Sequence, residues 1–152
     1  GWMLRFVAVF SVLALTFPAL AENAQQLAAA AAAGRLYQVE SLLAQGADVN
    51  GRNSAGRPAL VMAAFNGNQR TLAALLGAGA DVNVTDAQGN TALMEASARG
   101  HLLVVSSLLV AGADVNLKNK AGRTALDRAK TGNNNAVITR LEQAGASEGG
   151  GD

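Results

Sequence analysis

The chain has 152 residues, of which 50% are hydrophobic and 15% are charged, and its formal net charge is +1. It contains no cysteine and one histidine, which excludes a disulfide framework and a zinc site built from Cys and His ligands. A balanced charge with 4% aromatic residues also argues against nucleic-acid binding, which needs a basic footprint or stacking rings.

Residues 1–21 are typical of a secretory signal peptide. Arg5 precedes an uncharged, apolar run over residues 6–17, and Ala19 and Ala21 supply a small-x-small cleavage site. We expect cleavage after Ala21, which predicts a periplasmic or secreted protein with no stable membrane insertion. An uncleaved anchor or a buried terminal helix is the alternative, although the run is shorter than the about 20 residues of a membrane span.

The rest of the chain is repetitive. The sequence Gly-Ala-Asp-Val-Asn occurs at residues 46–50, 79–83 and 112–116, at intervals of 33 residues, and a fourth copy begins at residue 145 and then departs. A fixed period of this size indicates one supersecondary unit stacked on copies of itself. The period predicts a domain over residues 22–147 followed by a flexible tail over residues 148–152. Its units span residues 22–50, 51–83, 84–116 and 117–147.

Each unit predicts two short helices after a turn. The Asx-x-x-Gly segments that precede the first helices are turn sequences. Thr91 and Thr124 are placed to cap the first helices of two units, while Pro58 takes the same position without a hydroxyl. Glycines are expected to end these helices in the left-handed conformation, with Asn133 as the substitute in the last unit.

Apolar residues at helical spacing predict the core face of the second helices. The Asp and Asn residues of the repeated five-letter sequence are expected to bond the backbone of the loop that leads to the next turn. Polar replacements in the first and last units are typical of capping repeats, so we expect a complete array. The predicted core residues are Leu36, Val39, Leu42, Leu43, Leu72, Leu75, Leu76, Leu102, Val105, Leu108, Leu109, Ile138 and Leu141.

The segment over residues 86–101, Asp-Ala-Gln-Gly-Asn-Thr-Ala-Leu-Met-Glu-Ala-Ser-Ala-Arg-Gly-His, resembles an ankyrin repeat when followed by the Leu/Val helix and Gly-Ala-Asp-Val-Asn. The resemblance extends over about residues 23–146. It implies an all-α solenoid of four helix-turn-helix repeats joined by short β-turn or hairpin loops. The histidine of the usual Thr-Pro-Leu-His motif is absent, so weaker polar ties between repeats are expected.

Catalytic chemistry is poorly supported. The letters Gly-x-Ser-x-Gly over residues 145–149 match a nucleophile elbow, but that motif needs a strand before it and acid and histidine partners after it. His101 follows a capping glycine, where a role at the helix start is favoured over catalysis or metal binding. We therefore expect no enzymatic activity, no metal and no cofactor.

The resemblance implies that a partner binds to a concave face made of the turns and the first helices. Phe65 is the most suggestive of its residues, with core packing as an equal alternative. The basic residues are either functional or solvated loop charges. The predicted partner-binding residues are Arg52, Ser54, Arg57, Phe65, Asn66, Thr85, Gln88, Asn90, Met94, Arg99, Lys118, Lys120, Arg123 and Asp127.

On the opposite side, Tyr37, Leu103 and Val110 are expected to be scattered exposed residues, with a modest apolar patch for weak self-association as the alternative. The protein is expected to be a monomer. The resemblance implies a protein–protein interaction module in the bacterial envelope. The protein is expected to act as an accessory factor to a periplasmic protein. Enzymes of oxidative-stress defence are one class of partner that the resemblance suggests. A secreted effector or toxin-neutralising protein is the alternative.

Overall fold

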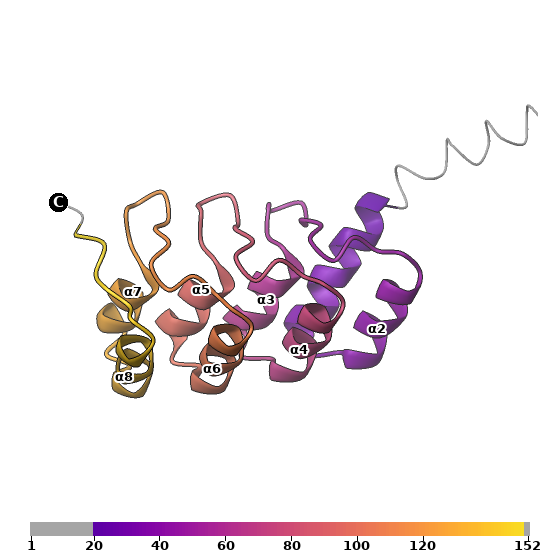
Figure 1. Ribbon diagram of the computed structural model, residues 1–152. Helices are drawn as coiled ribbons and strands as arrows, with labels where there is room; N and C mark the ends of the chain where they lie inside the picture. Colours follow the sequence, from indigo (N-terminus) through magenta and orange to yellow (C-terminus); the bar gives the residue numbers. More distant parts are fainter. Residues whose placement is uncertain (1–19, 151–152) are drawn as a thin grey trace, which may run out of the picture.

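The computed structural model describes residues 20–150. Within this range the chain forms four pairs of helices, stacked in one direction (Figure 1). The predicted signal peptide lies outside the described residues except for residues 20 and 21, which belong to a helix described over residues 20–33. The other helices are α2 (Leu36–Ala44), α3 (Ala59–Phe65), α4 (Gln69–Gly77), α5 (Ala92–Arg99), α6 (Leu102–Val110), α7 (Ala125–Thr131) and α8 (Asn135–Gln143).

The helices form two layers. Helices α3, α5 and α7 contact one another in sequence and continue the row that begins with the helix over residues 20–33, while α2, α4, α6 and α8 form the second row. Loops over residues 51–58, 84–91 and 117–124 project from the first row (Figure 1). Two of these loops close as hairpins through the antiparallel bridges Arg52–Pro58 and Thr85–Thr91. The predicted all-α solenoid with short hairpin loops is confirmed.

Local capping explains where the first-row helices begin and end. The Thr91 and Thr124 hydroxyls accept hydrogen bonds from the backbone N–H groups of Met94 and Asp127, which satisfies donors that have no partner within the helix. Pro58 occupies the same position without such a bond. Past the ends of α5 and α7, Gly100 has φ +74° and Asn133 has φ +56°, so the predicted left-handed termini are confirmed.

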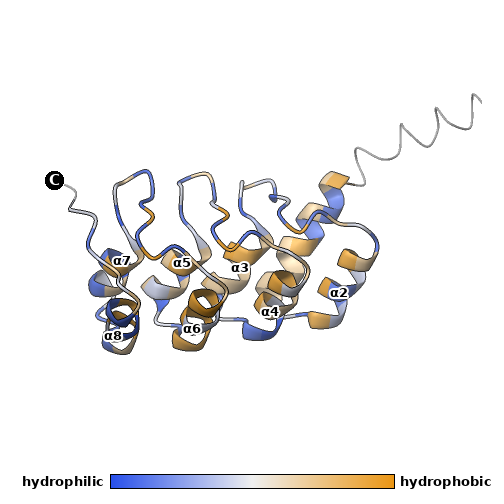
Figure 2. Ribbon diagram, viewed as in Figure 1, coloured by the Kyte–Doolittle hydropathy of each residue, from blue (hydrophilic) through white to orange (hydrophobic). Residues whose placement is uncertain are grey.

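The core lies between the two rows of helices. Small alanines of α3, α5 and α7 are almost fully buried and allow these helices to pack closely. Helices α3, α4 and α6 are mainly apolar, whereas the last pair is more polar (Figure 2). Leu102 was predicted to be a core residue but is 38% exposed, while its neighbour Val104 is 1% exposed. The apolar face of α6 is therefore Val104, Val105 and Leu108.

The repeated five-letter sequence ties each unit to the next. The Asp48 carboxylate accepts a hydrogen bond from the backbone N–H of Asn50 (2.9 Å), as predicted. The asparagine does more, because the Asn50 side-chain oxygen accepts from the backbone N–H of Asp81 in the following unit (2.8 Å). Equivalent bonds join Asn83 to Asp114, at 2.9 Å, and Asn116 to Ser147, at 2.9 Å. We call this series the asparagine ladder.

A second set of polar ties uses the residue before each second-row helix. The His101 ring Nε2–H donates to the carbonyl oxygen of Phe65 in the previous unit (3.1 Å). Asn68 and Asn134 occupy the same repeat position and donate to carbonyl groups at the end of the preceding first-row helix. The absent motif histidine therefore does not leave the units without polar contacts.

The beginning of the predicted flexible tail packs against α7. The backbone N–H of Gly149 donates to the Asp127 carboxylate (2.9 Å), and Lys130 pairs with Glu148. Gly149 is buried. Among residues 20–150, no helix is both long enough and apolar enough to cross a membrane.

Candidate partner-binding face

We define the hairpin face as the three loops over residues 51–58, 84–91 and 117–124 together with helices α3, α5 and α7. It corresponds to the face predicted to bind a partner. The loops are fixed to one another along the stack. The Arg52 guanidinium donates to the Thr85 carbonyl oxygen (2.7 Å), and the backbone N–H of Lys120 donates to the Gln88 carbonyl oxygen (3.0 Å). These bonds preorganise the face for binding.

Most of the predicted binding residues lie on this face and are accessible. Phe65, Thr85, Asn90 and Asp127 are partly buried. The residues that are exposed to solvent are Arg52, Ser54, Arg57, Asn66, Gln88, Arg99, Lys118, Lys120 and Arg123.

Met94 does not belong to the binding face, so that prediction is wrong. It is 1% exposed, and its sulfur lies 3.5 Å from the backbone nitrogen of Thr91, where it accepts a hydrogen bond. The helical position that was expected to face outward instead packs Met94 against the start of α5.

Two further predicted binding residues have structural partners. The Asn90 side-chain oxygen accepts hydrogen bonds from Asn119 (2.8 Å) and Arg128 (3.0 Å). The Asp127 carboxylate accepts from the backbone N–H groups of Thr124 and Gly149. Partial burial of Asp127 opposes ionisation, but these bonds and the nearby Arg123 charge outweigh it and lower the pKa of the carboxyl. Asp127 therefore stays ionised and fixes the start of α7.

Phe65 and Arg99 form the most distinctive pair on the face. The guanidinium carbon of Arg99 lies 3.9 Å from the centre of the Phe65 ring, within the range of a cation–π interaction. The two residues end helices of neighbouring units, α3 and α5. The stack thereby joins an aromatic ring and a cation that are 34 positions apart in the sequence.

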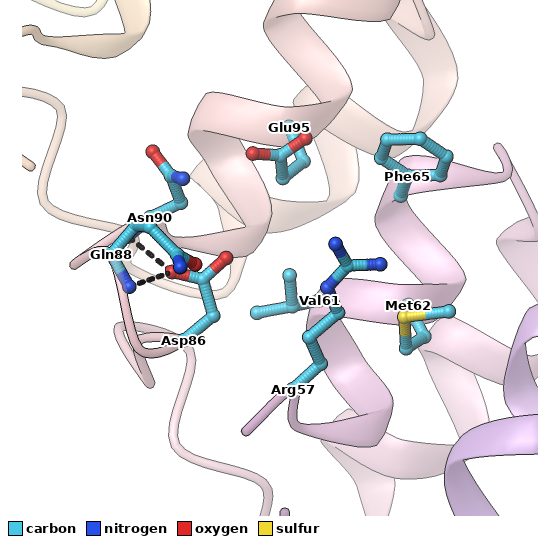
Figure 3. Close-up of a pocket in the computed structure, with 8 residues that line it drawn as sticks. All are labelled: Arg57, Val61, Met62, Phe65, Asp86, Gln88, Asn90 and Glu95. Atoms are coloured by element: carbon cyan, nitrogen blue, oxygen red, sulfur yellow. Dashed lines mark hydrogen bonds between the residues drawn. The ribbon is translucent and has the colours of Figure 1, made fainter. Parts of the chain in front are cut away.

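A small pocket of about 100 Å³ opens between α3 and α5. In Figure 3 the Arg57 side chain rises from its hairpin towards the gap between Glu95 and Phe65. The lining combines apolar and aromatic side chains with charged and polar groups. The pocket is lined by Arg57, Val61, Met62, Phe65, Asp86, Gln88, Asn90 and Glu95.

Asp86 and Glu95 were missed as residues of this site. The Asp86 carboxylate accepts from the backbone N–H groups of Gln88 and Asn90, both at 2.9 Å, and shapes the hairpin. Glu95 pairs with Arg128 at 2.9 Å. Glu95 and Arg128 occupy the same position in successive units, 33 residues apart. Opposite charges at one repeat position are the signal that predicts such a pair.

The residues that suggested chemistry have structural hydrogen bonds. The Ser147 hydroxyl of the Gly-x-Ser-x-Gly segment donates to the Asn116 side chain (3.1 Å), and His101 is bonded to Phe65. In the described part of the chain, no group of three or more His, Cys, Asp or Glu residues is placed to hold a metal ion. What the hairpin face offers is a binding surface with charged, polar and aromatic groups.

Comparison with protein families agrees with this architecture. A sequence model described as ankyrin repeats (3 copies) matches the chain twice, over residues 26–119 and 60–147. A comparison with curated proteins found no match. The family match covers most of the chain, and the helix pairs, hairpin loops and 33-residue period agree with it. The chain belongs to the ankyrin repeat family.

Proposed function

We propose that this protein is a non-catalytic, monomeric accessory factor of the bacterial envelope, which binds a periplasmic protein through its hairpin face. Ankyrin repeats mediate binding to other proteins. The Phe65–Arg99 pair carries the proposal for this particular face, because interface cores are enriched in aromatic residues and arginine. Enzymes that defend the envelope against oxidants are one class of partner within this proposal.

The export part of the proposal concerns residues 1–21, whose composition supports it. Expression of the full chain in a Gram-negative host is expected to give a periplasmic species that begins at Glu22. Cell fractionation and intact-mass measurement test this directly. Recovery of the uncut chain from the cytoplasm would contradict it.

The binding part predicts that the double variant Phe65→Ala, Arg99→Ala loses its partner. Hot-spot residues, which cluster near the centre of an interface, cost at least about 2 kcal/mol when truncated. If Phe65 and Arg99 form the hot spot, recovery in a pull-down falls by more than tenfold. The bait is the full chain with a C-terminal affinity tag, recovered from periplasmic extract of the native host. The captured protein is quantified by mass spectrometry.

The matched control is the double variant Tyr37→Ala, Arg70→Ala. Tyr37 is 85% exposed on α2, and Arg70 is exposed on α4, so this variant also removes one aromatic ring and one cation. Circular dichroism must show that both variants remain folded. Equal recovery of the partner by the Phe65/Arg99 variant and the wild type would overturn the assignment of this face.

A further inference from the structure

The hairpin face carries a strong excess of accessible positive charge. Seven of its basic side chains are exposed. Lys130 pairs with Glu148, and the other six form no ion pair within residues 20–150. The six come from the loops over residues 51–58 and 117–124 and from the end of α5. These residues are Arg52, Arg57, Arg99, Lys118, Lys120 and Arg123.

The acidic residues of the same face do not balance this charge at the surface. Asp86 and Glu95 are each 7% exposed, and Asp127 is partly buried. The carboxylates of Asp86 and Asp127 accept backbone hydrogen bonds, and Glu95 is paired with Arg128. An approaching molecule therefore meets the cations first.

Exposed carboxylates gather elsewhere on the molecule. Apart from Glu22 in the helix over residues 20–33 and Glu148 beside α7, they lie on the second-row helices and on the loops of the asparagine ladder. The basic residues of that side are Arg35, Arg70 and Arg140. The chain is close to neutral overall, with a net charge of +1, so its positive charge is concentrated on one side. The exposed acidic residues of the other side are Glu40, Asp48, Asp81, Asp114 and Glu142.

We propose that the hairpin face binds an acidic segment of a protein, with carboxylates over the loop cations and one aliphatic side chain in the pocket between α3 and α5. This inference rests on the proposed function and specifies the chemistry of the partner. Complementary charge directs association and selects among partners. The loop-to-loop hydrogen bonds hold the cations in place before the partner arrives.

The pocket between α3 and α5 is the place where the aliphatic side chain of the partner would bind. Val61, Met62 and Phe65 supply the apolar part of the lining, and the volume of about 100 Å³ is smaller than the roughly 150 Å³ cavity that holds a benzene ring. Asp86 and Glu95 line the pocket together with Arg57, so the lining carries two carboxylates for one cation and disfavours a further carboxylate. The acidic groups of the partner are therefore placed on the rim.

A protein segment fits this surface better than other polyanions. Arg99 covers the Phe65 ring, which is the one aromatic ring on the face, so bases have no free stacking platform. Within residues 20–150 the large exposed apolar residues lie outside this face: Leu20 in the helix over residues 20–33, Tyr37 on α2, and Leu102, Leu103 and Val110 on α6. The hairpin face therefore lacks the apolar anchors that hold proteins in an anionic membrane surface.

The test uses labelled synthetic peptides of twelve residues, in which Glu and Ser alternate around one central Leu. The protein is purified after expression of the full chain, and its binding of the labelled peptide is measured by fluorescence anisotropy. We expect binding at 25 mM NaCl and at least tenfold weaker binding at 300 mM, because salt screens exposed charges. The matched peptide with Gln in place of Glu should not bind. Replacing the central Leu with Ser should weaken binding several-fold.

Protein variants locate the site. Arg57→Gln and Lys120→Gln are each expected to weaken binding of the acidic peptide by about two- to fivefold, as is typical of exposed charge pairs. Arg35→Gln and Arg70→Gln remove cations of the second row and should leave binding unchanged. Equal binding of the Gln peptide, or equal loss in the second-row variants, would overturn the proposal.

Two further arms separate other anionic ligands. A twelve-nucleotide DNA strand, or vesicles of equal parts phosphatidylglycerol and phosphatidylcholine, would overturn the proposal if either bound more tightly than the acidic peptide and lost affinity in Arg57→Gln. A pull-down partner that depends on Phe65 and Arg99 but resists 300 mM NaCl would refute only the acidic-segment inference. A pull-down partner that depends neither on Phe65 and Arg99 nor on the NaCl concentration would refute the binding face itself.

Discussion

Replacing Leu108 with alanine is expected to lower the free energy of unfolding by about 2–5 kcal/mol. Leu108 is fully buried in α6, which packs against α4 on one side and α8 on the other. The shortened side chain would leave a cavity between neighbouring units, and cavities of this kind add to the lost transfer free energy. Because a repeat array is held together by contacts between neighbours, the loss also weakens coupling across the middle of the stack.

Leu103→Ala is the matched control for this experiment. It makes the same change in the same helix at a residue that is 74% exposed, so we expect a change within about 0.5 kcal/mol. Urea unfolding followed by circular dichroism measures both. Similar midpoints for the two variants would show that α6 does not pack as described.

The second large effect is expected at Gly67, where alanine should destabilise the protein by about 2–3 kcal/mol. Gly67 has φ +69°, a conformation that costs about 1–2 kcal/mol for a residue with a Cβ. The added Cβ would also lie 2.7 Å from the His101 ring. Movement of that ring would break its hydrogen bond to the Phe65 carbonyl, which is worth roughly 1 kcal/mol.

Gly79→Ala separates the two contributions. Gly79 also has a positive φ, of +91°, but a Cβ there would meet nothing within 4 Å. Only the backbone strain should remain, at about 1–2 kcal/mol. Thermal or urea unfolding of both variants gives the difference, and equal destabilisation would mean that His101 contributes nothing to the contact between units.

The architecture follows from the sequence because its signals are local and repeated. Thr91, Gly100 and Asn133 each act through the backbone of their own turn, so their roles could be predicted without knowledge of the packing. The 33-residue period then placed the same turn at each unit. Helix α6 shows where this reasoning fails. Its sequence, Leu-Leu-Val-Val-Ser-Ser-Leu-Leu-Val, is apolar on nearly every side, so periodicity could not distinguish exposed Leu102 from buried Val104.

The candidate site could be predicted only in part, because it forms between units. The Phe65–Arg99 contact and the Glu95–Arg128 ion pair each join residues of two neighbouring units. A sequence pattern within one unit therefore does not contain either pair. Met94 was misplaced for a related reason. Its outward or inward orientation depends on how α5 is rotated against α3 and α7, and the sequence of one helix does not define that rotation.

The asparagine ladder has a consequence for how such a protein can change in length. Each unit ends in an acceptor, the asparagine side chain, and each following unit supplies the matching donor at its own aspartate or at Ser147. The same connector is present at every junction that the ladder spans. A duplicated block of 33 residues would therefore enter the array with its joints already matched. The asparagine ladder would continue through an added internal unit, so the binding surface can lengthen in steps of one repeat.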